Sequence, residues 1–176
     1  MKVCIYGAGA IGGWIGVHLA QKGHAVSVVA RGLTLEALKK NGLQCVQAQT
    51  QSQSPDASLN ANLGANLSAN VKVSADPADL GPQDLIIVAV KAPAMLDVAQ
   101  GIAPLLGPDT MVMTAMNGVP WWFFQGFGDK LQGTTLNTID PDGHIAKAIP
   151  AKHVLGCVVH ASCSLDAPGV VRHHFG

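Results

Sequence analysis

Three glycines near the start of the chain have the spacing of a dinucleotide-binding loop. The apolar residues 2–6 run directly into Gly7, Gly9 and Gly12. The first glycine allows a tight turn after a strand, the second lets a pyrophosphate approach the backbone, and the third lets a helix pack close to a sheet. The helix that follows offers free N–H groups and the positive end of its dipole to phosphates. The candidate phosphate-binding residues are Gly7, Ala8, Gly9, Ala10, Ile11 and Gly12.

The residue after the second predicted strand indicates which dinucleotide binds. An NAD site usually has an Asp or Glu there, about 20 residues after the glycines, which binds the ribose 2′-hydroxyl. This chain has Arg31 instead, and no acidic residue follows until Glu36. A guanidinium can hold a 2′-phosphate with two hydrogen bonds or stack on an adenine, so the sequence favours NADP over NAD. A solvated arginine at a strand end is the alternative interpretation.

Two further polar residues follow continuous apolar segments, which are typical of buried parallel strands. Residues 84–90 lead to Lys91, and residues 110–116 lead to Asn117. Ligands of such sheets bind outside the carboxyl ends of the strands, so we expect both side chains to lie near the glycine loop. An ammonium can donate to a carbonyl, a ribose or a phosphate, and an amide can both donate and accept. The alternatives are a solvated lysine and an asparagine that serves only a tight Asn–Gly turn.

Strand and helix patterns alternate along the chain, which predicts an α/β fold with a doubly wound, Rossmann-type and mostly parallel sheet. We treat residues 1–176 as one dinucleotide-binding domain. A helix that begins at Pro120 would carry four successive aromatic residues, 121–124, which pack in the core or contact another surface. The predicted strands are residues 2–6, 25–30, 43–46, 71–74, 84–90, 110–116 and 153–160, and the predicted helices are residues 11–22, 35–41 and 95–106, with one short helix from Asp140.

Residues 47–70 differ from the rest of the chain. They are rich in Gln, Asn, Ser, Ala and Leu, contain no aromatic residue, and carry one charge, Asp56. This composition is typical of low-complexity sequence, so we interpret the segment as a loop insertion between two edge strands. A lid over the binding site is the alternative interpretation.

Composition excludes several classes of protein. Hydrophobic residues make up 48% of the chain, charged residues make up 12%, and the net charge is zero. Because no run of Lys or Arg occurs, a nucleic-acid partner is not expected. No stretch has transmembrane length, so a membrane location is not expected either. The four cysteines lack zinc-site spacing and are interpreted as reduced thiols of a cytoplasmic protein.

Together these motifs resemble those of the ketopantoate reductase (2-dehydropantoate 2-reductase) family. The resemblance implies NADPH-dependent reduction of a small 2-keto acid, 2-dehydropantoate, to pantoate, on the way to pantothenate and coenzyme A. It places the pyrophosphate at the glycine loop, the 2′-phosphate at Arg31, Lys91 beside the nicotinamide half, Asn117 between cofactor and substrate, and Ser162 at a further cofactor contact. The matching segments are residues 7–13, Arg31, residues 90–92, residues 116–120 and residues 167–174.

The chain also departs from this family. Family members are far longer and add a C-terminal helical domain, which carries the lysine that acts as general acid. This chain ends at Gly176, so we expect it to lack that domain, that lysine and the last strand of the sheet, and to be inactive alone. An exposed sheet edge or residues 121–124 could then support a homo-oligomer. The alternatives are a reductase of another 2-keto acid, of the 6-phosphogluconate or hydroxyacid dehydrogenase type, and a non-catalytic nucleotide-binding module.

Overall fold

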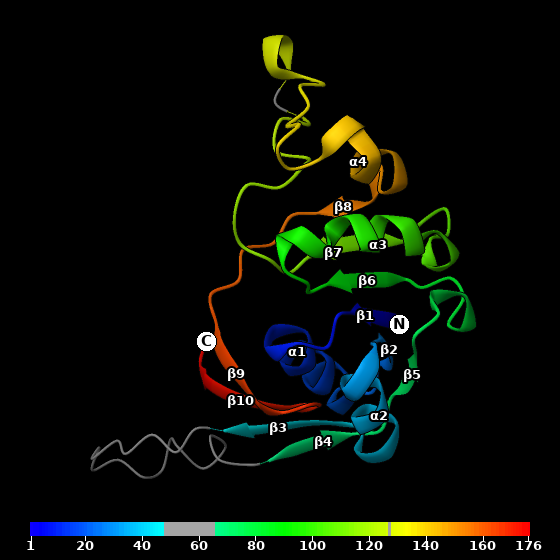
Figure 1. Cartoon of the computed structure of the whole chain (residues 1–176), viewed down its shortest axis with the longest axis vertical. Coiled ribbons are helices and arrows are strands. Elements are labelled where there is room, and N and C mark those ends of the chain that lie inside the picture. Colours follow the sequence, from blue (N-terminus) through cyan, green and yellow to red (C-terminus); the bar gives the residue numbers. More distant parts are fainter. Residues whose placement is uncertain (48–65, 127) are drawn as a thin grey trace.

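A parallel sheet of six strands forms the centre of the computed structural model, which describes residues 1–47, 66–126 and 128–176. The strand order is β5-β2-β1-β6-β7-β8 (Figure 1). Numbered within this sheet, the order reads 3-2-1-4-5-6, which confirms the predicted doubly wound, Rossmann-type arrangement. The strands are β1 (Lys2–Tyr6), β2 (Ala25–Val29), β5 (Lys72–Ser74), β6 (Leu85–Val88), β7 (Met111–Thr114) and β8 (Val154–Leu155).

Helices cover both faces of this sheet. The helices α1 (Ala10–Gln21) and α2 (Gly32–Asn41) lie on one face, and α3 (Met95–Gly101) and α4 (His144–Ala148) lie on the other (Figure 1). Side chains of β1 alternate between the two cores, as a strand requires. Val3 and Ile5 pack with the first pair of helices, whereas Cys4 and Tyr6 pack with the second pair. This double burial explains the continuous apolar strands of the sequence.

A second sheet, which the sequence did not predict, lies on the outer side of α1 (Figure 1). Its order is β4-β3-β10-β9, and β3 pairs in parallel with β10. The chain can approach α1 closely because Gly13 and Gly16 have no side chains. A Cβ added to these glycines would lie 2.7 Å from Val171 Cγ2 and 2.9 Å from Leu43 Cδ1. The strands are β3 (Leu43–Gln47), β4 (Leu67–Ala69), β9 (Ser162–Ala167) and β10 (Val170–Phe175).

Several predicted elements need correction. Pro120 does not start a helix: residues 121–126 form turns, and Gly126 adopts a φ of +85°, which ends any helix there. The strand predicted at residues 153–160 is limited to β8, but β8 completes the six-strand order, so the expected loss of the last strand is wrong. The helix predicted at residues 95–106 ends at Gly101 and is followed by a single 3₁₀ turn, Ala103–Leu105.

The predicted insertion at residues 47–70 is only partly described. Its residues 48–65 lie outside the described part of the chain, so neither the loop nor the lid interpretation is tested there. Its last residues form β4 of the second sheet rather than loop. Of the described helices, none combines the length and hydropathy that a membrane crossing needs. The described residues also include no group of three or more His, Cys, Asp or Glu side chains that could hold a metal ion.

Candidate functional site

The glycine loop joins β1 to α1 at the carboxyl edge of the six-stranded sheet. Gly7 has a φ of +97°, and a Cβ on it would lie 2.6 Å from Val90 Cγ1. A Cβ on Gly12 would lie 2.1 Å from the carbonyl oxygen of Gly7, so only glycine lets α1 start this close to the loop. Gly9 differs, because a Cβ there would have no heavy atom within 4 Å. Gly7 and Gly12 therefore serve the fold, whereas Gly9 faces open space.

The N-terminus of α1 has unpaired donors and a positive end. Gly9 precedes the helix in extended conformation, no side chain caps it, and no acidic residue lies in the first turn. The N–H of Gly13 donates to the carbonyl oxygen of Gly9 at 2.8 Å and closes the first helical turn. The N–H groups of Ala10, Ile11 and Gly12 precede this bond and have no partner within the helix, as at any α-helix N-terminus. Such a terminus binds phosphate groups.

A pocket of about 270 Å³ lies beside this loop. Gly7, Ala8 and Gly9 form one wall, and the end of β2 with Arg31 and Thr34 forms another. Asp97 of α3 and Leu165 of β9 also line it, so elements far apart in the sequence contribute to the pocket. Most of the lining is apolar, and the polar groups lie at the side of Arg31. The pocket therefore combines an apolar slot with one cationic side.

Arg31 lies at the N-terminus of α2 and reaches over this pocket. Its Nη1 lies 3.3 Å from Oδ2 of Asp97, and the two side chains are 65% and 61% exposed. Tyr6, the last residue of β1, lines the same pocket. Burial raises the pKa of the Tyr6 phenol, and the Arg31 charge lowers it by less, so the phenol stays protonated at neutral pH. Because the ion pair of Arg31 with Asp97 is largely exposed, the guanidinium can exchange the carboxylate for another anion.

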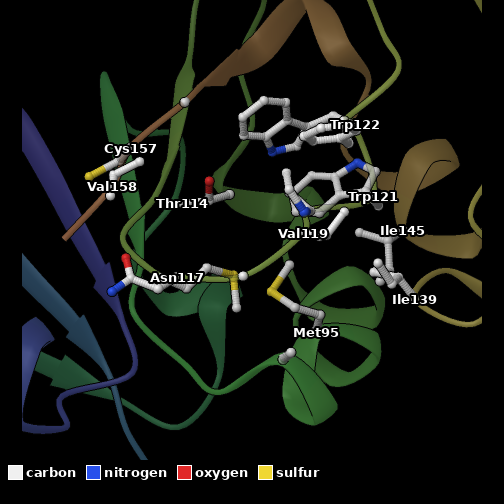
Figure 2. A pocket seen from close by; sticks show the side chains of 16 residues that line it. Met95, Thr114, Asn117, Val119, Trp121, Trp122, Ile139, Ile145, Cys157 and Val158 are labelled. Atoms are coloured by element: carbon white, nitrogen blue, oxygen red, sulfur yellow. The ribbon is translucent and has the colours of Figure 1, made fainter. Parts of the chain in front are cut away.

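A second pocket, of about 390 Å³, lies at the carboxyl end of β7 (Figure 2). Asn117 lies at one side of it and Trp121, Trp122, Ile139 and Ile145 at the other (Figure 2). The Asn117 amide nitrogen donates to the carbonyl oxygen of Val159 at 3.1 Å, and its oxygen accepts from the N–H of Val159 at 2.9 Å. Asn117 thereby holds the irregular segment that follows β8 against the end of β7.

The structure brings most of the predicted site residues to one edge of the sheet. Gly7, Ala8, Gly9 and Arg31 line the first pocket, Ala10, Ile11 and Gly12 form the adjoining helical turn, and Asn117 lines the second pocket. Lys91 is exposed and lines neither pocket, although its neighbours Val90 and Ala92 line one pocket each. Ser162 begins β9 opposite Phe175 in the second sheet and also lines neither pocket.

The sequence analysis missed three polar residues that line the first pocket: Tyr6, Thr34 and Asp97. Two of them had a signal. Tyr6 is the last residue of the first predicted strand, and Asp97 lies in the first turn of the helix after a central strand, so both positions face the carboxyl edge. Thr34 carried no signal of this kind, because the predicted helix began one residue after it.

Arg31 and the free N–H groups of α1 provide two positive features beside the first pocket. A dinucleotide with a pyrophosphate and a 2′-phosphate has complementary negative groups, and the apolar slot suits an adenine ring. NADP fits this arrangement on chemistry alone.

Comparisons with known proteins show which family this chain resembles. Residues 3–120 match the family model described as ketopantoate reductase PanE/ApbA. The chain is 42% identical over 174 residues to the 2-dehydropantoate 2-reductase of Mesorhizobium japonicum (strain LMG 29417 / CECT 9101 / MAFF 303099), an alignment that covers 98% of this chain and 49% of that protein.

Solved structures show the same relation. A crystal structure of a protein assigned as a ketopantoate reductase from Ralstonia solanacearum MolK2 is 50% identical, with a TM-score of 0.84, and the match covers 99% of this chain and 49% of that one. A PanE/ApbA family ketopantoate reductase from Ralstonia eutropha JMP134 is 26% identical, with a TM-score of 0.69 and coverage of 99% and 46%. The chain therefore spans about half the length of the relatives it matches.

Proposed function

Because this chain belongs to the ketopantoate reductase family, we propose that it binds NADPH for the reduction of a 2-keto acid, with 2-dehydropantoate as the first candidate substrate. The observation that carries the proposal is the position of Arg31. Its exposed guanidinium lines the same pocket as Gly7 and Gly9, beside the uncapped N-terminus of α1.

The glycine loop would hold the pyrophosphate. Because a Cβ on Gly9 would meet no protein atom, the space above it is available to a ligand. The N–H groups of Ala10, Ile11 and Gly12 would donate to phosphate oxygens there. Gly7 and Gly12 support this site indirectly, since the 2.1 Å approach of a Gly12 Cβ to the Gly7 carbonyl shows how tightly helix and loop pack.

Arg31 would hold the 2′-phosphate. A guanidinium binds a phosphate with two parallel charge-assisted hydrogen bonds, whereas NADH offers only a hydroxyl at this position. The ion pair with Asp97 is long at 3.3 Å and largely exposed, so little free energy is lost when Arg31 leaves it.

The substrate would lie toward Lys91 and Asn117. Bound NADPH supplies a hydride to the keto carbon of the substrate. Lys91 carries an exposed ammonium between Val90 and Ala92, so it can donate a hydrogen bond at the boundary of the two pockets. Asn117 positions residues 157–160 through its two bonds to Val159 and retains one N–H for a ligand. Ser162 remains a predicted cofactor contact, on the same strand as Leu165 of the first pocket.

The general acid is expected outside these 176 residues, because the relatives are about twice as long. A polypeptide of this sequence should therefore bind NADPH but oxidise it no faster with 2-dehydropantoate than without it. Consumption of NADPH that depends on 2-dehydropantoate, measured as loss of nicotinamide absorbance, would contradict the assignment of the acid to another segment.

Fluorescence titration with NADPH, and separately with NADH, tests the proposal. Energy transfer from Trp14, Trp121 and Trp122 to the nicotinamide reports binding. We expect saturable binding with a preference for NADPH. Arg31→Ala should weaken NADPH by about 10- to 150-fold, because a hydrogen bond to a charged group contributes about 1.5–3 kcal/mol, and should leave NADH within about twofold.

Lys22→Ala is the matched control, because Lys22 is exposed at the opposite end of α1 and the substitution removes the same charge. It should bind NADPH as the unchanged chain does. Equal losses in the two variants would contradict a specific role for Arg31. Failure of the unchanged chain to bind either dinucleotide would contradict the proposed function itself, and equal affinity for both would favour a non-catalytic nucleotide-binding module.

A further inference from the structure

We propose that Asp97 limits the preference of this site for NADPH over NADH by competing with the 2′-phosphate for Arg31. The inference rests on the proposed function, in which Arg31 holds that phosphate. It assigns a role in cofactor specificity to a residue of α3, and α3 contains none of the predicted phosphate-binding residues.

Asp97 lies where it can compete. Its Oδ2 is 3.3 Å from Nη1 of Arg31, and both side chains line the pocket of about 270 Å³. The carboxylate reaches this position because α3 starts at Met95, directly after the turn Ala92–Ala94 that leaves the carboxyl end of β6. The ion pair therefore joins two elements that flank the pocket, the start of α2 and the start of α3.

The charged side chains of the pocket form one ion pair. Among the described residues that line it, Arg31 and Asp97 are the only two that are charged, and the Tyr6 phenol remains neutral. The pair leaves the pocket with no net charge. A 2′-phosphate adds close to two negative charges at this point, so it must take the place of the carboxylate at Arg31. The 2′-hydroxyl of NADH adds no charge and meets no such opposition.

The exposure of the two side chains sets the size of the effect. Because both are more than half exposed, water and salt screen the attraction between Asp97 and Arg31, with which the phosphate competes. Exposed ion pairs of this kind have small effects, so removal of the carboxylate charge should change NADPH affinity by about two- to fivefold rather than by orders of magnitude. The ion pair is weak enough for NADPH to bind and strong enough to reduce the preference for NADPH over NADH.

The substitution Asp97→Asn tests the inference, because it removes the charge and retains the shape. We expect NADPH to bind about two- to fivefold more tightly than to the unchanged chain, and NADH to stay within about twofold. The control Asp109→Asn removes the same charge from an exposed residue before β7, at the amino end of the sheet. It should change neither affinity.

A combined variant separates competition from a structural effect. In Arg31→Ala the gain from Asp97→Asn should shrink below about twofold, because the contested guanidinium is gone. Unchanged or weaker NADPH binding by Asp97→Asn would overturn the inference, since it would mean that Asp97 is neutral or helps to position Arg31. That result leaves the proposed function standing, because NADPH binding by the unchanged chain tests the function separately.

Discussion

Gly9 and Gly12 belong to one loop, yet the structure predicts opposite consequences for alanine at the two positions. A Cβ on Gly12 would lie 2.1 Å from the Gly7 carbonyl oxygen and 3.0 Å from both Ala89 Cβ and Ile5 Cγ2. Two of the three contacts involve the backbone or a short side chain, so the start of α1 itself must move. At Gly9 no heavy atom lies within 4 Å, and its φ of −75° suits any residue.

The expected loss of stability for Gly12→Ala follows from these contacts. Overpacking in a core costs about 1–3 kcal/mol, and contact with a carbonyl oxygen puts Gly12→Ala at or above the upper end. Helix propensity returns at most about 1 kcal/mol, because alanine replaces glycine inside a helix. The net loss of about 2 kcal/mol lowers Tm by about 4–8 °C for a chain of this size. Gly9→Ala should stay within about 0.5 kcal/mol of the unchanged chain.

Binding should show the reverse pattern for Gly9. The added methyl group occupies the space through which a pyrophosphate approaches the N–H groups of α1, so Gly9→Ala should lose most NADPH affinity while it remains fully folded. Thermal unfolding followed by circular dichroism, together with NADPH titration of both variants, measures both effects. The reasoning is refuted if Gly12→Ala unfolds at the same temperature as the unchanged chain, or if Gly9→Ala binds NADPH normally.

Two further predictions concern buried groups away from the pocket. Burial raises the pKa of Cys4 to about 12 and that of Cys163 to about 11, from 9.0. The contribution of these two thiols to the free energy of unfolding is therefore complete below pH 9 and is lost as pH rises toward 11–12, because the thiols ionise first in the unfolded chain. The urea midpoint should therefore fall above pH 9, and Cys4→Ala should reduce that fall. Asp140 is buried and accepts from the N–H groups of Ile145 and Ala146 at 2.7 and 2.9 Å. Asp140→Ala should lower Tm by about 2–8 °C, as expected for a lost helix cap of about 1–2 kcal/mol, and a Tm equal to that of the unchanged chain would show that these bonds contribute little.

The central sheet could be predicted because its residues carry local signals. Each buried strand is a short apolar segment followed by a turn, and the glycine loop has a fixed spacing, so both the doubly wound sheet and the position of the glycine loop at its edge followed. The helix predicted after Pro120, which would have carried the aromatic residues 121–124, is wrong. A proline favours a helix start, but Gly126 and Gly128 adopt φ values of +85° and +70°, and Trp121 is buried in the core on the α3 side. These tertiary constraints are not visible in the local sequence.

The second sheet could not be predicted for a different reason. Its strands are partly polar, and β3 finds its partner β10 far along the chain, with Val171 opposite Cys45. No local pattern encodes such a pairing. The same limit applied to the Arg31–Asp97 ion pair, which joins residues 66 positions apart. Residues near the carboxyl ends of strands could be identified one at a time, but the contacts between them required the structure.

The pairing of β3 with β10 also has a consequence for the order of folding. In the register of these strands, partners lie 126 positions apart in the sequence, as with Gln44 and Val170. During synthesis β3 and β4 can pack on the outer face of α1 early, but β10 can join them only after residues 170–175 have been made, and pairings of such long range are slow to form. Until then the space at Gly13 that Val171 fills, together with the unpaired edge of β3, stays open to other apolar segments. The hairpin of β9 and β10 thus completes the packing around α1.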